Sequence, residues 1–183
     1  MANVDRPNGF RFVKTLTGTP VSAMIRQYNV DSSNASAIFI GDAVTLDADG
    51  NVSKSATNAS FLGVVVGVGV DNITHGPTGY YNAANLNQRY IPASTAGVVA
   101  VIPVEGNLFE IQSASDLDLA IGAPADIVPG TGNTTTGLST TELTTSTNAD
   151  VIVVEYNTSP DNDTTLANAR YIVAFNDVEH ATT

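Results

Sequence analysis

The sequence predicts an all-β protein, a small β-barrel or sandwich with an extended N-terminal arm and long loops. Its apolar residues come in short runs rich in Val and Ile, separated by clusters of Gly, Asp and Asn, and such runs indicate strands rather than amphipathic helices. The regular spacing of the runs is typical of barrels and sandwiches. Hydrophobic residues make up 43% of the 183-residue chain, enough for one core. We therefore expect an arm over residues 1–20 and a single β domain over residues 21–183.

Several segments from residue 21 onward have the composition of strands. They are residues 21–28, 37–40, 43–46, 60–70, 97–104, 108–112, 124–128, 150–156 and 170–175. Gly63, Gly67 and Gly69 interrupt the Val-rich fourth segment, and glycine inside a strand often marks a bulge or a close backbone approach. We expect that strand to be bent.

Turn residues predict how some of these strands are connected. Asp49-Gly50 lies between two apolar runs and predicts a tight hairpin, because both residues tolerate the backbone conformation that such a turn needs. Gly106 predicts a second hairpin between residues 97–104 and 108–112. Residues 113–119 predict one or two turns of helix, with a serine at the N-cap.

Two long segments have no clear strand pattern. Residues 130–148 are rich in Thr, and this composition fits both a mobile loop and an edge hairpin of β-branched residues. Residues 78–90 are rich in Tyr and Asn, and we expect a long loop there.

The few positive charges gather near the N-terminus. The first 26 residues contain four of the seven basic residues and one acid, which gives +3, while the remaining 157 residues carry three bases and 17 acids, which gives −14. Such an acidic body repels polyanions, and three scattered cations cannot supply the six or so phosphate contacts of a duplex-binding protein. We expect no nucleic-acid partner.

No motif in the chain specifies a reaction. There is no Cys, and the two histidines, His75 and His180, have no second ligand at metal-binding spacing. The longest apolar run, residues 61–70, is about half the length of a membrane-spanning helix. We expect no enzymatic activity, no metal, no cofactor and no membrane partner, with Asp161-Asn162-Asp163 as a minor alternative for calcium.

The arm has the pattern of an extended strand. Pro7, Gly9, Gly18 and Pro20 exclude a continuous helix. Between these residues, aromatic and basic side chains alternate, so an extended chain would have two unlike faces.

Two arrangements of this arm fit the pattern. It could lie across a partner, with Phe10 and Phe12 in pockets and the basic side chains paired with acidic groups of that partner. It could instead form the first strand of the protein's own barrel, with its charges in solvent. In the first arrangement the binding residues are Arg6, Pro7, Phe10, Arg11, Phe12 and Lys14.

Three segments together resemble the capsid decoration, or cement, proteins of tailed bacteriophages. The segments are IFIGDAVTLDADGNV followed by FLGVVVGV, AGVVAVIPVEGNLFEIQ, and IGAPADIVPGTGNTTTGLSTTE. Within them, the family's short strand motifs are similar to Gly41-Asp42-Ala43-Val44, to Gly63-Val64-Val65 and to the run from Val101 to Gly106. The opening RPNGFRFV is also similar to the start of such proteins. The long arm and the Tyr-rich and Thr-rich segments depart from the simplest members of this family.

The resemblance implies a non-enzymatic function on a virion. It implies that the major capsid protein is the partner, that the protein is a homotrimer, and that it is made in the host cytoplasm and located on the outer surface of the capsid. Several subunits that bind neighbouring capsomers at once would turn weak contacts into avidity.

A carbohydrate-binding or adhesive β-module on a virion surface is the alternative from a different class. Tyr80, Tyr81 and Tyr90 would then stack on sugar faces, and the neighbouring amides would bind hydroxyl groups. The absence of Trp disfavours this alternative.

Overall fold

The structure is a computed structural model that describes residues 3–69 and 88–179. Within these residues the chain forms thirteen strands and one four-residue helical turn, α1 (Val21–Met24). All strand pairs in the sheets are antiparallel, and no closed barrel forms in the described part of the chain. The predicted all-β, sandwich-like class is confirmed.

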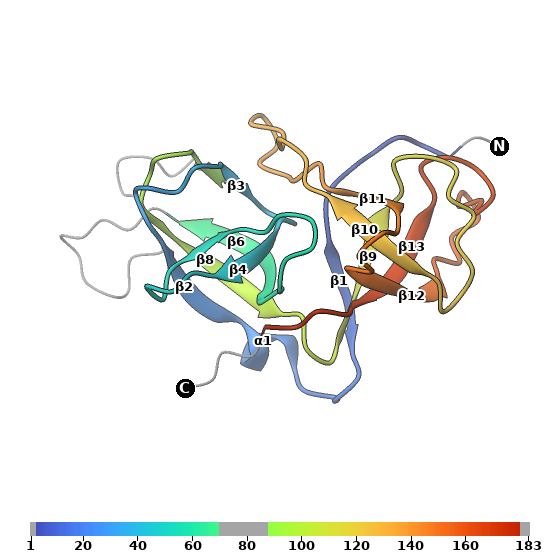
Figure 1. Ribbon diagram of the computed structural model, residues 1–183, viewed down its shortest axis with the longest axis horizontal. Helices are drawn as coiled ribbons and strands as arrows, with labels where there is room; N and C mark the ends of the chain where they lie inside the picture. Colours follow the sequence, from blue (N-terminus) through green and yellow to red (C-terminus); the bar gives the residue numbers. More distant parts are fainter. Residues whose placement is uncertain (1–2, 70–87, 180–183) are drawn as a thin grey trace.

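The strands form two main sheets that lie side by side (Figure 1). The five-stranded sheet has the order β2 (Arg26–Val30), β8 (Gly97–Pro103), β6 (Gly63–Gly69), β4 (Ala43–Leu46) and β5 (Val52–Lys54). The six-stranded sheet has the order β1 (Arg11–Thr15), β9 (Asn107–Gln112), β13 (Arg170–Phe175), β12 (Val151–Tyr156), β10 (Pro124–Val128) and β11 (Glu142–Thr145). A small ribbon pairs β3 (Ile38–Phe39) with β7 (Tyr90–Ile91).

Both main sheets curl toward closure. In the five-stranded sheet the edge strands β2 and β5 contact each other without pairing. In the six-stranded sheet β11 approaches β9, and an isolated bridge joins Ser113 to Leu143. Strong twist of short antiparallel strands produces this curvature.

The middle strands of the five-stranded sheet are buried on both faces, because they lie between two hydrophobic cores. Val64 of β6 and Ile102 of β8 belong to the core shared with the six-stranded sheet. Their neighbours Val65 and Val101 point to the opposite face and belong to the second core. Successive side chains of a strand point to opposite faces, so the uninterrupted Val and Ile runs of these strands are explained.

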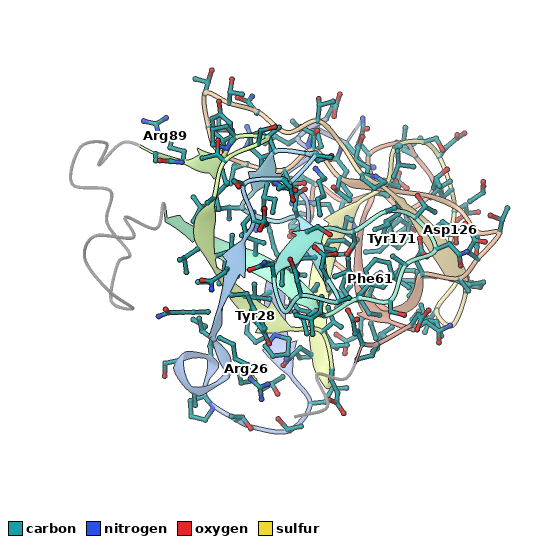
Figure 2. The ribbon with its side chains drawn as sticks, turned by 60° about the vertical axis from the view of Figure 1, so that its left-hand side comes forward. Arg26, Tyr28, Phe61, Arg89, Asp126 and Tyr171 are labelled. Atoms are coloured by element: carbon teal, nitrogen blue, oxygen red, sulfur yellow. The ribbon has the colours of Figure 1, made fainter. Side chains whose placement is uncertain are left out.

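The chain passes between the two sheets three times (Figure 1). It leaves β1 of the six-stranded sheet for β2 of the five-stranded sheet, and it returns through the turn at Gly106 between β8 and β9. After β13 it crosses again, and Val178 forms a bridge with Phe61. Figure 2 shows Phe61 in the middle of the molecule, where it is fully buried.

The hairpin predicted at Asp49-Gly50 is confirmed. β4 and β5 pair antiparallel across it, Gly50 has φ +84°, and the amide of Asp47 donates to the carbonyl of Asn51 at 2.8 Å. The bend predicted in the Val-rich strand is also present, because the pairing register of β6 with β8 shifts between Val65 and Gly67.

Three local predictions were wrong. β8 and β9 do not form a hairpin, because the turn at Gly106 sends them into different sheets. Residues 113–119 are not helical; Leu117 and Leu119 pack against the core, and Ser113 forms a bridge instead of a helix cap. Residues 21–24 are helical rather than extended, and none of them is buried, so no neighbouring strand holds them in a sheet.

The Thr-rich segment contains both irregular chain and an edge strand. Residues 130–141 are irregular, and β11 then forms the outermost strand of the six-stranded sheet. Most of the Tyr-rich segment, together with His75 and His180, lies outside the described residues.

Asp42, from the motif that resembles cement proteins, has a structural position. It is fully buried and forms an ion pair with Lys54 at 2.9 Å. Its carboxylate also accepts hydrogen bonds from the amide of Phe39 at 2.9 Å and from the hydroxyl of Ser139 at 2.6 Å. A buried charge is tolerated when it is paired and hydrogen-bonded in this way.

Candidate functional site

The N-terminal segment, residues 3–25, is built into the folded body. Phe10 is buried in the core shared by the two sheets, where its ring centroid lies 4.7 Å from that of Phe175. The amide of Phe10 donates to the carbonyl of Gly41 at 2.8 Å. The arm is therefore the first strand of the protein's own sheet, and Phe10 is not available for a pocket on a partner.

Gly9 makes this approach possible. Its φ is +65°, and a Cβ atom at this position would lie 2.4 Å from the carbonyl oxygen of Gly41 and 2.6 Å from the Cβ of Ser139. Only glycine combines this backbone conformation with such a close contact. The Asn8-Gly9 step therefore turns the chain into the core immediately before β1.

β1 is an edge strand with an irregular outer side. It pairs with β9, and the register shifts between Phe12 and Lys14, so Val13 is an extra residue in a β-bulge. Phe12 is half-buried, with its ring centroid 6.0 Å from that of Phe109. A bulge and an exposed lysine on an edge strand hinder the addition of another strand. The exposed surface of the segment, rather than its backbone, is available to a partner.

The basic side chains of the segment differ in their partners. Lys14 pairs with Glu155 at 2.6 Å, and Arg11 pairs with Glu110 at 3.2 Å. The Arg6 side chain forms no ion pair and donates no hydrogen bond to any residue in 3–69 or 88–179. Pro7, next to it, is half-buried. Arg11 and Lys14, which were predicted to pair with acidic groups of a partner, pair instead with acids of their own chain.

Two of these cations share a pocket with a third that the sequence analysis did not identify. A cavity of about 220 Å³ lies between the N-terminal segment, β9 and the start of β13. Arg6, Arg11 and Arg170 line it, together with the acids Glu110 and Asp161. We call this cavity the arginine pocket.

Hydrogen bonds hold the walls of the arginine pocket in place. Gln112 is buried; its Oε1 accepts from the amide of Arg6 at 2.9 Å, and its Nε2 donates to Asp5, Glu142 and Asn168. Burial raises the pKa of the Glu142 carboxyl, and the hydrogen bond that Gln112 donates to it lowers the pKa by a smaller amount. The backbone at Arg6 is therefore anchored while its guanidinium is exposed.

The acids of the pocket are already in contact with arginines. Arg170 donates to Asp161 at 2.7 Å, and this hydrogen bond holds the pKa of the Asp161 carboxyl below its usual value, with a smaller contribution from the charge of Arg6. One oxygen of the Glu110 carboxylate accepts a hydrogen bond from the Arg11 side chain, and the other accepts one from the side-chain amide of Asn157. Both acids of the pocket are therefore engaged by hydrogen bonds from residues of the same chain.

A second surface feature lies further along the same segment. Val13, Leu16, Val21 and Ile25 are between 37 and 66% exposed, which is unusual for large apolar side chains that follow one another so closely. We call these four side chains the apolar face. Arg26 (Figure 2), at the start of β2, directly follows Ile25 in the chain and is exposed.

The residues considered for other sites have structural partners. Tyr90 stacks on Phe39 with 4.7 Å between ring centroids, so one of its ring faces is covered; Tyr80 and Tyr81 lie outside the described residues. Asn162, in the segment considered for calcium, donates its side-chain amide to the carbonyls of Asn157 and Arg170. Over residues 3–69 and 88–179, no three His, Cys, Asp or Glu side chains are grouped as a metal site would require.

In the described part of the chain, no helix has the length and apolar character to cross a bilayer.

Comparison of the chain with family models, with curated proteins and with solved structures gives no match.

Proposed function

We propose that the protein is a non-enzymatic decoration protein that binds the outer surface of a phage head and stabilises contacts between capsomers. The observation that carries this proposal is the apolar face, because four large exposed apolar side chains within thirteen residues are more typical of a protein–protein contact than of a solvated surface. Its partner in the proposal is the major capsid protein. The resemblance of the strand motifs to cement proteins supports the same function.

The proposed mode of binding differs from insertion of a free arm. Phe10 stays in the core, while Leu16 and Ile25 of the apolar face contact the shell, with Arg26 at its rim. In this proposal the protein acts as a homotrimer on the virion, and simultaneous contacts of three subunits provide the avidity.

A sedimentation experiment with point variants tests this proposal. Purified shells that lack the protein are mixed with wild type, with Leu16→Asp or with Ile121→Asp, and are then pelleted. Leu16 and Ile121 are matched in exposure, at 66% and 60%, but Ile121 precedes β10 in the six-stranded sheet. We expect wild type and Ile121→Asp to co-sediment saturably and Leu16→Asp to bind about tenfold more weakly or worse, because a buried unpaired charge is costly.

Two results would contradict the proposal in different ways. If wild type does not bind shells, the function is wrong, and a glycan array becomes the next test. If all three proteins bind equally, the protein binds capsids but not through the apolar face. Deletion of the segment is a poor test, because it would remove Phe10 from the core.

A further inference from the structure

The arginine pocket concentrates positive charge on an acidic protein. The chain has net charge −11 and five arginines, three of which line this one cavity. The charged side chains of its lining are Arg6, Arg11 and Arg170 against Glu110 and Asp161, which leaves one positive charge in excess.

Most guanidinium N–H groups of the pocket donate no hydrogen bond to the described residues. Each guanidinium carries five N–H groups. Within the described residues, the side chains of Arg11 and Arg170 each donate one hydrogen bond, to Glu110 and Asp161, and the Arg6 side chain donates none. The pair with Asp161 is partly open to solvent, since the Asp161 side chain is 59% exposed, and such pairs are weak.

We propose that the arginine pocket binds a single carboxylate group of a ligand, held by Arg6 and Arg170. The planar fork of a guanidinium matches the two oxygens of a carboxylate. One negative charge also neutralises the excess of the pocket, whereas a phosphate dianion would leave a surplus negative charge on an already acidic body. An acidic amino-acid side chain and an acidic sugar both supply this group. The proposal concerns the isolated protein and does not rest on capsid binding.

NMR of the arginine side chains tests the proposal directly. Only five Nε–Hε signals exist in the ¹⁵N-labelled protein, and Arg26 and Arg89 lie outside the pocket (Figure 2). The protein is titrated at pH 7 and constant ionic strength with N-acetylglutamate α-amide, with glucuronate and with inorganic phosphate. We expect the carboxylates to shift the Arg6 and Arg170 signals saturably, with a Kd on the order of a millimolar for so small a ligand.

Matched variants give the second readout. Arg6→Gln keeps the backbone amide that bonds to Gln112, and we expect it to weaken carboxylate binding by about tenfold. Arg26→Gln changes an equally exposed arginine outside the pocket, and we expect no effect. Arg170→Gln removes the second guanidinium that holds the carboxylate, and we expect it to weaken binding as well.

The relative affinities of the three ligands identify the kind of carboxylate that the pocket prefers. Tighter binding of the glutamate derivative supports an acidic side chain as the natural ligand, and tighter binding of glucuronate supports an acidic sugar. Preference for phosphate, equal shifts of Arg26 and Arg89, or unchanged affinity in both Arg6→Gln and Arg170→Gln would overturn the proposal.

Discussion

Asp126 organises a loop with one carboxylate. It lies on β10, and its oxygens accept hydrogen bonds from the amides of Thr147 at 2.7 Å, Asn148 at 3.1 Å and Ala149 at 2.8 Å. Burial on its own would raise the pKa of this carboxyl, but the hydrogen bonds outweigh it and lower the pKa to about 2. The charged form of Asp126 is therefore part of the folded structure, in the position that Figure 2 shows.

We expect Asp126→Asn to lower the free energy of unfolding at pH 7 by about 2 kcal/mol. A pKa of about 2 against an ordinary 3.8 corresponds to roughly 2.5 kcal/mol of preference for the ionised form. Because the folded-state pKa is the lower one, this stabilisation is present above about pH 4 and is lost as the pH falls toward 2. Urea unfolding of both proteins at pH 7 and near pH 2 measures the difference, which we expect to shrink at low pH.

Asp49→Asn is the control for this prediction. Asp49 also accepts from a backbone amide, that of Asn51, but it is fully exposed in the hairpin turn. We expect its substitution to change stability little. A loss for Asp126→Asn that is the same at both pH values would show that packing, and not the charge, explains the effect.

At the scale of elements, two substitutions in the N-terminal segment test whether this segment is part of the folded core. We expect Phe10→Ala to lower the free energy of unfolding by about 3–5 kcal/mol, as is usual for a buried aromatic side chain. Val13→Ala, three residues further along at the exposed bulge of β1, should change it by less than about 0.5 kcal/mol. Denaturant unfolding measures both variants. Equal, small effects would mean that β1 is only loosely attached.

The same strand illustrates what could be predicted from the sequence. The alternation around Phe10 and Phe12 predicted an extended strand, but it fits a strand in the protein's own sheet as well as one on a partner. The deciding contacts are with Phe109 and Phe175, about a hundred residues or more away in the chain. No local pattern contains that information.

Only part of the arginine pocket could be predicted from the sequence, because one of its arginines is distant from the others in the chain. Arg6 and Arg11 stood out because they are close in sequence, whereas Arg170 joins them only through the pairing of β9 with β13. Lys54 likewise has no apolar pattern around it that predicts its burial with Asp42. Strands with long Val and Ile runs were predicted well, because a strand that is buried on both faces needs an apolar residue at nearly every position.

At the scale of the whole molecule, the chain path joins the two sheets. β1 and β9–β13 form the six-stranded sheet, and β2, β4, β5, β6 and β8 form the five-stranded sheet. After β13 the chain returns to the side of the five-stranded sheet, where Val178 forms a bridge with Phe61. The carboxylate of Glu179 accepts from the amide of Leu46 at 2.8 Å, which fastens the last described residues to the five-stranded side. The strands of the five-stranded sheet come from one stretch of chain, but the residues after β13 also contact this sheet, and the two sheets share one hydrophobic core. Unfolding of one sheet would therefore remove contacts of the other.

We therefore expect the protein to unfold in one cooperative transition, even though its 183 residues exceed the roughly 150 below which single domains usually behave in this way. Val44→Ala and Val173→Ala are matched variants for this test, because both valines are fully buried but belong to different cores. Each substitution should shift the whole calorimetric transition to lower temperature and keep the calorimetric and van't Hoff enthalpies equal. Because Val64 and Ile102 of the five-stranded sheet pack in the core that contains Val173, a loss on one side weakens the other. A Val44→Ala transition that splits in two would show instead that the sheets unfold independently.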